Sequence, residues 1–293
     1  MQKILIAGCG YIGTRVARIW QGSGAEVICL VRSPDHQFSL ASEGLAARSC
    51  SFDNPADMPT LDVAGGIVYY LVPPPGGGTA DSRARYFCSA LLKSAPAARL
   101  IYLSATSVYG EQNGGIVTEV SETNPSSAMG KRRLDAESAF REYGAVAGVP
   151  IVTLRVSGIY GPGRLPLMQI SQGQPLLRED ESGPSNRIHA DDLARICCSA
   201  AEKGEAGDIF NVSDGNPSSM TTYFNACADA LGYPRQPQVT MEEARQVMSP
   251  LMFSYVNESR TIDNSRMLER LGVRLRYPTI AEGLAVSVEN QQT

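Results

Sequence analysis

The first 31 residues follow a pattern that few folds accommodate: a buried strand, a glycine-rich turn, an amphipathic helix and a second buried strand. Continuous aliphatic runs occupy residues 3–7 and 26–31, as in strands that are buried on both faces. Between them, residues 11–21 carry apolar side chains at helical spacing, and a Gly-Ser-Gly turn at 22–24 ends the helix. This order is typical of a parallel βαβ unit.

The turn after the first strand reads Gly8-Cys9-Gly10-Tyr11-Ile12-Gly13, a G-x-G-x-x-G placed between a strand and a helix. In that context Gly8 permits the tight turn, Gly10 lets the backbone approach a pyrophosphate, and Gly13 allows the helix to pack closely on the sheet. Tyr11 and Ile12 open the helix, whose free N–H groups attract an anion. These residues are therefore predicted to bind a dinucleotide. The alternative is a tight structural turn without a ligand.

The end of the second strand indicates which dinucleotide is bound. An NAD site usually has Asp or Glu there to bind the ribose 2′-hydroxyl, but this chain reads Leu-Val-Arg-Ser at 30–33, with no acid until Asp35. A guanidinium and a hydroxyl suit a 2′-phosphate. We therefore predict NADP(H) rather than NAD(H), with Arg32 as the phosphate clamp and Ser33 as a secondary donor. The alternative is that Arg32 is a solvated loop residue.

Further strand-like runs at 66–72, 100–104 and 150–156 alternate with helical segments near 81–95 and 131–147. This alternation predicts an α/β fold, a Rossmann-type doubly wound parallel sheet with helices on both faces. The rhythm breaks at a Gly/Pro-rich stretch after residue 157. The predicted division is a dinucleotide-binding domain at 1–156, to which 187–213 returns, and a small substrate-covering lobe at 157–186 and 214–293.

Composition excludes several other classes. The 293 residues are 43% hydrophobic and 19% charged, as in ordinary globular proteins, and their formal net charge of −4 argues against a nucleic-acid partner. No run approaches the roughly 20 apolar residues of a membrane-spanning helix, and no signal pattern opens the chain, so we expect a cytoplasmic protein. Two histidines exclude a histidine-rich metal centre, and seven cysteines without a C-x-x-C are expected to be reduced and buried.

Six segments in order resemble the extended short-chain dehydrogenase/reductase superfamily, in its NAD-dependent epimerase/dehydratase family. They are GCGYIG at 8–13, LSATSVYG at 103–110, LRVSGIYGPGR at 154–164, RIHADDLA at 187–194, IFNVSDG at 209–215 and LGVRLRYPTIAEGL at 271–284. The resemblance implies a small-molecule substrate, often a nucleotide sugar, and a possible homodimer formed through the helices near 81–95 and 131–147. It also implies that Asp53 contacts the adenine amino group. A turn or helix cap is the alternative role of Asp53.

The resemblance places substitutions at all three catalytic positions of the family. Ala105 stands where active members have Ser or Thr, Met129 where they have Tyr, and Arg133 where they have Lys. Met129 has no proton to exchange, whereas Arg133 keeps a positive charge that could bind the nicotinamide ribose. In this respect the chain resembles the atypical, YeeZ-like bacterial members of the family.

Other side chains could replace the missing groups. Ser104 and Thr106 flank the lost serine position, Tyr109 lies at the end of the strand, and Tyr160 could line the substrate cleft. Each has a structural alternative, as a cap or a packing residue. His189 is interpreted as a residue that precedes a helix start. The basic run at 131–133 is interpreted as a solvated helix face, and the alternative is that one of its members meets an anionic substrate at the cleft.

Two functions are consistent with these patterns. The first is an NADP(H)-binding, epimerase/dehydratase-like oxidoreductase or nucleotide-sugar isomerase with a degraded Ser-Tyr-Lys site. The alternative is a non-catalytic, NADP(H)-sensing regulatory or scaffold protein, which is favoured by the loss of all three catalytic side chains beside an intact glycine motif.

Overall fold

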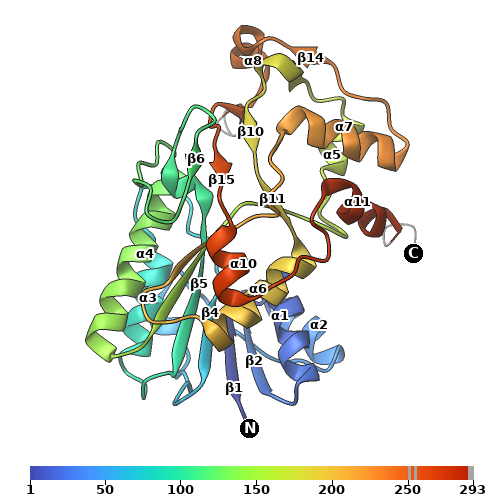
Figure 1. Ribbon diagram of the computed structural model, residues 1–293. Helices are drawn as coiled ribbons and strands as arrows, with labels where there is room; N and C mark the ends of the chain where they lie inside the picture. Colours follow the sequence, from blue (N-terminus) through green and yellow to red (C-terminus); the bar gives the residue numbers. More distant parts are fainter. Residues whose placement is uncertain (250–251, 254–255, 290–293) are drawn as a thin grey trace.

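The computed structural model describes residues 1–249, 252–253 and 256–289, and its centre is a seven-stranded sheet in which every pairing is parallel (Figure 1). The strand order is β12-β7-β5-β4-β1-β2-β3. These strands are β1 (Lys3–Ala7), β2 (Glu26–Val31), β3 (Ala46–Ser49), β4 (Ile67–Tyr70), β5 (Arg99–Ala105), β7 (Ile151–Val156) and β12 (Ile209–Val212). The order reverses between β1 and β4, which leaves a crevice at the carboxyl ends of these strands.

Helices cover both faces of this sheet. The helices α1 (Tyr11–Gly22) and α6 (Ala190–Lys203) bury one apolar core, which includes Trp20. The helices α3 (Ser82–Leu91) and α4 (Ala128–Ala147) bury a second core, in which the rings of Tyr70 and Phe140 pack 4.8 Å apart. Helix α2 (Pro34–Ser42) lies at the β3 edge, and α10 (Ser265–Leu271) returns beside α6. The predicted Rossmann-type fold is confirmed.

The predicted elements of the sheet match the structure closely. The strands expected at 3–7 and 26–31 have those bounds, and the helix expected at 11–21 extends by one residue. The strand expected at 66–72 is shorter, because Leu71 and Val72 leave β4 for the proline-rich loop at 73–75. Burial explains the agreement, since β1, β2 and β4 are apolar runs buried in the middle of a parallel sheet.

A second group of elements lies beyond the carboxyl edge of the sheet, in the upper right of Figure 1. Its apolar core joins Tyr160 and Leu284 to residues of α5 and α7. The helices here are α5 (Leu167–Ser171), α7 (Met220–Leu231), α8 (Met241–Val247) and α11 (Ile280–Glu289). Short strand pairs lie outside the sheet: β6 (Ile116–Val117) with β15 (Thr261–Ile262), β8 (Gly158–Tyr160) with β11 (Arg187–His189), β9 (Leu176–Leu177) with β14 (Gln238–Val239), and β10 (Pro184–Ser185) with β13 (Ser218–Ser219).

Across the described ranges, no helix combines the length and the apolar character that crossing a bilayer requires.

Candidate functional site

The glycine-rich turn has the geometry of an anion-binding loop. Gly8 adopts φ +84°, and a Cβ there would lie 2.7 Å from the backbone nitrogen of Val72. Gly10 is open, with no heavy atom within 4 Å of an added Cβ. It precedes α1, where no side chain in the described part of the chain caps the first N–H groups. A close approach at Gly10 to uncapped N–H donors fits the pyrophosphate of a dinucleotide.

Arg32 and Ser33 lie at the carboxyl end of β2, beside this turn. The turn is held to β2 because the N–H groups of Gly8 and Cys9 donate to the Leu30 carbonyl oxygen, at 3.0 and 3.1 Å. Arg32 is exposed, and its side chain forms no hydrogen bond to any described residue. Ser33 caps α2, since its Oγ accepts from the His36 N–H at 3.3 Å. That bond leaves the Ser33 hydroxyl proton available to a ligand.

Asp53 is an ion-pair residue and not a cap. Its two carboxylate oxygens accept from Arg83 at 2.6 and 2.9 Å, and this pairing lowers the pKa of Asp53. Asn54, the next residue, caps the short 3-10 helix η1 (Pro55–Asp57). Arg83 also donates to the Pro73 carbonyl oxygen at 3.0 Å, so the pair fixes the proline-rich loop that follows β4. The helix-cap interpretation of Asp53 is therefore wrong.

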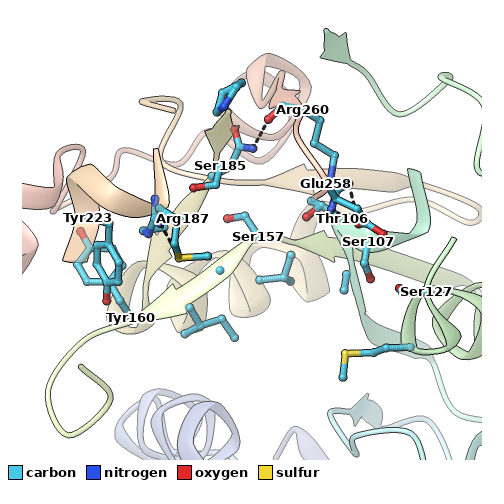
Figure 2. Close-up of a pocket in the computed structure, with 18 residues that line it drawn as sticks. Thr106, Ser107, Ser127, Ser157, Tyr160, Ser185, Arg187, Tyr223, Glu258 and Arg260 are labelled. Carbon is cyan, nitrogen blue, oxygen red and sulfur yellow. Dashed lines mark hydrogen bonds and ion pairs between the residues drawn. The ribbon is translucent and has the colours of Figure 1, made fainter. Parts of the chain in front are cut away.

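A cavity of about 350 Å³ opens at the carboxyl ends of β5 and β7, between the sheet and the second group of elements (Figure 2). Its lining residues are Ala105, Thr106, Ser107, Ser127, Met129, Val156, Ser157, Gly158, Ile159, Tyr160, Pro184, Ser185, Asn186, Arg187, Met220, Tyr223, Glu258 and Arg260. The Tyr11 hydroxyl links the two sites, since it donates across 2.9 Å to the Pro162 carbonyl oxygen, two residues beyond the cavity wall. This bond ties the helix that follows the glycine-rich turn to the segment just beyond the cavity wall, and both the turn and the cavity lie at the carboxyl edge of the sheet.

Of the residues predicted at or near the lost catalytic positions, some line the cavity and others do not. Ala105, Met129, Thr106 and Tyr160 line the cavity. Ser104, Tyr109 and Arg133 are held elsewhere: Ser104 donates to Glu137 at 2.6 Å, Tyr109 to Asn211 at 2.7 Å, and Arg133 to the Leu103 carbonyl oxygen at 2.8 Å.

The bonds of Ser104 and Tyr109 belong to a buried network beneath the cavity. Its centre is the ion pair of Arg155 and Glu137, 2.9 Å apart, in which each side chain is 5% exposed. Arg155 also donates to the Tyr109 hydroxyl at 3.0 Å. Burial alone would lower the pKa of Arg155, but the Glu137 carboxylate more than offsets this, and the pKa is raised. This network holds Ser104 and Tyr109 away from the cavity, in a structural role.

The ring of Tyr160 lines the cavity, but its hydroxyl is hydrogen-bonded to the backbone. The hydroxyl donates to the Thr279 carbonyl oxygen at 3.3 Å, and a Cβ added at Gly283 would lie 2.2 Å from the hydroxyl oxygen. Burial, reinforced by Asp214 and Asp192, raises the pKa of Tyr160. A phenol bonded in this way is a poor proton donor to a ligand in the cavity.

The basic run at 131–133 is only partly solvated. Lys131 is exposed, but Arg132 is buried and donates to the carbonyl oxygens of Gly77 and Gly78, at 3.2 and 2.8 Å. Arg133 is bonded to β5. The interpretation of this run as a solvated face is therefore wrong for both arginines. Backbone carbonyls accept hydrogen bonds from the Nη1 atom of each arginine, and no sequence pattern indicates such partners.

His189 has the helix-start role that the sequence predicts. It caps α6, because its Nδ1 accepts from the Asp191 N–H at 3.3 Å. Its side chain is fully buried against the rings of Tyr160 and Tyr277, and burial lowers the pKa of His189. The imidazole is therefore neutral in the folded protein near pH 7.

Sequence reasoning missed the charged residues of the cavity. Arg187, on β11, is 5% exposed and lies with its guanidinium 4.1 Å from the centroid of the Tyr223 ring. Arg260 donates twice to Glu258, at 3.1 Å. Both arginines lie in sequence segments far from 105–107, so only the tertiary fold brings them to the cavity. The available signal was the arginine that opens the segment RIHADDLA.

The cavity can bind and polarise a ligand more readily than it can exchange protons. Ser107 and Ser157 have buried Oγ atoms without a hydrogen-bond partner among the described residues, and Arg187 supplies charge. Among the described residues that line the cavity, Glu258 is the one with a carboxylate. Its two oxygens accept hydrogen bonds from Ser126 and Arg260. A carboxylate held in this way acts weakly as a general base, because its partners stabilise the ionised form.

The fold and the crevice define a Rossmann-type α/β protein with a ligand cavity at the carboxyl edge of its sheet. The model of the NAD dependent epimerase/dehydratase family matches residues 4–213, and the chain belongs to this family. Protein YeeZ of Escherichia coli K12 is 24% identical over 287 residues, which cover 95% of this chain and 97% of YeeZ. The predicted family and the likeness to YeeZ are confirmed.

Other relatives are matched over shorter stretches. The trifunctional UDP-glucose 4,6-dehydratase/UDP-4-keto-6-deoxy-D-glucose 3,5-epimerase/UDP-4-keto-L-rhamnose-reductase RHM2 of Arabidopsis thaliana is 29% identical over 125 residues. The match covers 39% of this chain and only 19% of the plant protein. The activities of that longer protein therefore do not transfer to this chain.

Solved structures share the fold along the whole chain. A functionally unknown conserved protein from Silicibacter pomeroyi DSS superposes with a TM-score of 0.83 at 27% identity, covering 100% of both chains. MoeE5, solved in complex with UDP-glucose and NAD, superposes with a TM-score of 0.77 at 22% identity, covering 99% of this chain and 98% of MoeE5. The likeness to MoeE5 shows the fold alone.

Proposed function

We propose that this protein is an NADP(H)-dependent oxidoreductase or isomerase of the epimerase/dehydratase type, acting on a substrate held in the cavity. The observation that carries the proposal is the open turn at Gly10, which lies at the same carboxyl edge of the sheet as the cavity and is tied to the segment beyond the cavity wall by the bond from Tyr11 to Pro162. The proposed substrate is a small molecule such as a nucleotide sugar, covered by the lobe at 157–186 and 214–293.

The residues proposed to hold the dinucleotide are those of the turn and of the second strand. The uncapped N–H groups of α1 would bind the pyrophosphate, Arg32 and Ser33 the 2′-phosphate, and Asp53 the adenine amino group. Arg133 retains donors beyond its bond to Leu103, and these would bind the ribose hydroxyls. The exposed guanidinium of Arg32 supports NADP(H) over NAD(H), because it suits a phosphate dianion.

The residues of the cavity set the chemistry that is open to a substrate. A bound nicotinamide supplies or accepts hydride. The hydroxyls of Ser107 and Ser157 would bind a substrate oxygen, and the positive charge of Arg187 would stabilise negative charge that develops nearby. Met129 and Ala105 contribute an apolar wall and no proton. Protons would therefore come from water, and the substrate would be one whose protonation is easy.

Calorimetric titration with NADPH, NADP⁺, NADH and NAD⁺ tests the cofactor assignment. The two phosphorylated forms should bind more tightly by about tenfold or more, and Arg32→Glu should abolish this preference. Arg178→Glu, an exposed arginine outside the cavity lining, is the matched control for the change in charge. Equal affinities for all four nucleotides, or an unchanged preference in Arg32→Glu, would show the assignment to be wrong.

A single-turnover experiment tests the reaction. The absorbance of NADPH should fall when the loaded protein meets a carbonyl substrate from a panel that includes 4-keto nucleotide sugars. Absorbance that stays constant with every member, in a protein that binds NADPH, would refute the oxidoreductase proposal.

One observation favours a second candidate, a non-catalytic NADP(H) sensor. The groups best suited to proton transfer are occupied: Tyr109 in the buried network, Tyr160 on Thr279 and Glu258 on Arg260. A sensor must bind a partner with different affinity in its NADP⁺ and NADPH forms, because a ligand shifts an equilibrium only by its differential affinity. Partner capture that is equal with NADP⁺, NADPH and no nucleotide would dismiss this candidate.

The cellular setting is also a proposal. The seven cysteines are all buried free thiols, which supports a reducing compartment such as the cytoplasm. The proposed homodimer would use α3 and α4, which lie side by side on one face of the sheet (Figure 1).

A further inference from the structure

Two of the seven cysteines are in contact beneath the glycine-rich turn. Cys9 is the residue between Gly8 and Gly10, and Cys29 belongs to β2. Their sulfur atoms are hydrogen-bonded at 2.9 Å, and the two residues are 1% and 0% exposed. A covalent S–S bond is about 2.05 Å long, so the two sulfurs need to approach by only about 0.9 Å to form one.

The surrounding backbone holds Cys9 in this position. The Cys9 N–H donates to the Leu30 carbonyl oxygen at 3.1 Å, and Leu30 directly follows Cys29 in β2. The preceding residue, Gly8, is confined by Val72, whose backbone nitrogen would lie 2.7 Å from an added Cβ. Two reacting groups that the fold holds together have an effective concentration far above that of separate molecules.

The contact between the sulfurs makes Cys9 the thiol of the pair that ionises more readily. When Cys9 ionises, the Cys29 S–H can donate to its thiolate, and this hydrogen bond lowers the pKa of Cys9 in spite of burial and raises the pKa of Cys29. Helix α1 begins two residues after Cys9, and a helix N-terminus also favours a thiolate. The thiolate is the reactive form of cysteine.

The other five thiols lack this arrangement. In the part of the chain that the structure describes, none of them is hydrogen-bonded to a second sulfur. Burial raises the pKa of each of them, namely Cys50, Cys88, Cys197, Cys198 and Cys227. Buried thiols that stay protonated are inert. Oxidation is therefore expected at Cys9 and Cys29 before any other cysteine.

A small oxidant can approach Cys9 through the turn. Gly8 and Gly10 on either side of it are half-buried, and a Cβ added at Gly10 would meet no heavy atom within 4 Å. Cys9 thus lies directly below an open part of the surface, although its own side chain is buried. Hydrogen peroxide is small and uncharged, so it loses less solvation free energy than a charged oxidant on entering such a place.

We propose that Cys9 and Cys29 are a redox-active dithiol, which a hydroperoxide converts to a disulfide, and that the disulfide weakens dinucleotide binding at the turn. The second part rests on the proposed function, because it concerns the dinucleotide site. The disulfide draws Cys9 towards β2, and Gly10 and the first N–H groups of α1 shift with it. These are the groups proposed to approach the pyrophosphate, so their displacement costs affinity.

The oxidation balances with hydrogen peroxide as the oxidant. The Cys9 thiolate attacks one peroxide oxygen, the O–O bond breaks, and hydroxide leaves, which gives a sulfenic acid on Cys9. The Cys29 sulfur then attacks the sulfenic sulfur, so that an S–S bond forms and the S–O bond breaks. The two thiol protons, with the two electrons that the sulfurs give up, reduce the peroxide to two molecules of water.

Disulfide mapping tests the first part. The reduced protein is treated with hydrogen peroxide, the remaining thiols are alkylated under denaturing conditions, and the peptides are identified by mass spectrometry. The peptides that contain Cys9 and Cys29 should be linked, and the other five of the seven thiols should be alkylated. The matched control is Cys50→Ala, which removes a buried thiol without a sulfur partner and should form the same link as the wild type.

Variants of the pair separate the two steps. Cys29→Ala should stop at the sulfenic acid, which dimedone traps on Cys9, because the second thiol is absent. Cys9→Ala should keep Cys29 reduced. A wild-type protein without the link between Cys9 and Cys29, or with links to other cysteines at equal yield, would overturn the inference. This result needs no variant, so it decides the first part even if a variant does not fold.

Calorimetric titration with NADPH tests the second part. The oxidised wild-type protein should bind NADPH more weakly than the reduced protein by about tenfold or more, and dithiothreitol should restore the affinity. Treatment of Cys9→Ala with peroxide should leave its affinity as it was before treatment. Equal affinities of the oxidised and reduced wild-type protein would overturn the second part. A reduced protein that does not bind NADPH would refute the proposed function and the second part with it, whereas the mapping still decides the first.

Discussion

Arg133 donates from Nη1 to the carbonyl oxygen of Leu103 at 2.8 Å, which fastens α4 to β5 one helical turn beyond Met129. The same guanidinium has an Nε that is buried and lacks a hydrogen-bond partner in the part of the chain described. A single amine could not both bond to the strand carbonyl and present further donors in a fixed plane. Arg133 thus forms one structural hydrogen bond, and this bond fixes the direction of its remaining donors.

Replacing Arg133 with methionine should therefore have two effects. The free energy of unfolding should fall by about 2 kcal/mol, since a hydrogen bond from a charged donor to a buried carbonyl is lost. The NADPH dissociation constant should rise several-fold if the remaining donors bind the ribose. Urea denaturation and calorimetry measure the two effects separately.

The neighbouring residue provides the control. Lys131→Met removes a positive charge from an exposed site on the same helix, and both quantities should stay at their wild-type values. A normal NADPH affinity in the folded Arg133→Met protein would remove Arg133 from the cofactor site while keeping its structural role.

Two glycines of the turn should respond differently to alanine. In Gly10→Ala the backbone has φ −96° and the new Cβ meets no atom within 4 Å, so stability should change by less than about 0.5 kcal/mol. NADPH affinity should nevertheless fall by about tenfold or more, because the methyl group occupies the space proposed for the pyrophosphate.

Gly8→Ala is the matched comparison. Its Cβ would lie 2.7 Å from the Val72 nitrogen at φ +84°, so this variant should lose about 1–3 kcal/mol or more of stability. Thermal unfolding and NADPH titration of both variants check the pair. Wild-type NADPH binding by Gly10→Ala would argue against a dinucleotide at this turn.

The sequence was sufficient for the sheet because local burial sets its strands. Residues 4–7 and 27–31 are apolar without interruption, and such runs mark strands buried on both faces. The resemblance to the family placed Ala105 and Met129 at two of its catalytic positions, and both residues line the cavity.

The chemistry of the cavity could not be predicted in this way. Arg187 reaches it because the two-stranded pair of β8 and β11 joins residues about thirty positions apart. Glu258 and Arg260 arrive from a still more distant segment. Such short strands carry little periodicity, so their pairing depends on tertiary packing. Likewise, nothing local shows that Ser104 and Tyr109 bond to Glu137 and Asn211 and not to a ligand.

The buried pair of Arg155 and Glu137 should be costly to break. Arg155→Met leaves the Glu137 carboxylate 5% exposed and without its cation, and the free energy of unfolding should fall by about 3–5 kcal/mol. The double variant Arg155→Met/Glu137→Leu should lose less than the sum of the two single variants, because neither charge is then left unpaired. Additive losses in urea denaturation would show that the two charges do not interact.

Asp214 should make stability depend on pH in the opposite sense to a typical carboxylate. Its side chain is 5% exposed, Oδ1 accepts from the Asn216 N–H at 2.9 Å, and Oδ2 has no partner in the described part of the chain. Burial raises the pKa of Asp214 to about 6. In the unfolded chain the pKa of an aspartate is about 3.9, so between these values the folded state binds the extra proton.

The sign of the effect follows directly. The contribution of Asp214 to stability is fully present below about pH 4 and is lost as the pH rises through about 6, because ionisation is resisted only in the folded protein. A shift of about two pKa units corresponds to about 3 kcal/mol. Asp214→Asn should therefore match the wild type near pH 4 and exceed it in stability by up to that amount at pH 7. Asp180→Asn, at an exposed carboxylate, should follow the wild-type curve throughout. Urea denaturation at pH values from 4 to 7 measures the difference. If the free energies of unfolding of Asp214→Asn and the wild type ran parallel over this pH range, the Asp214 carboxyl would ionise as easily in the folded protein as in the unfolded chain.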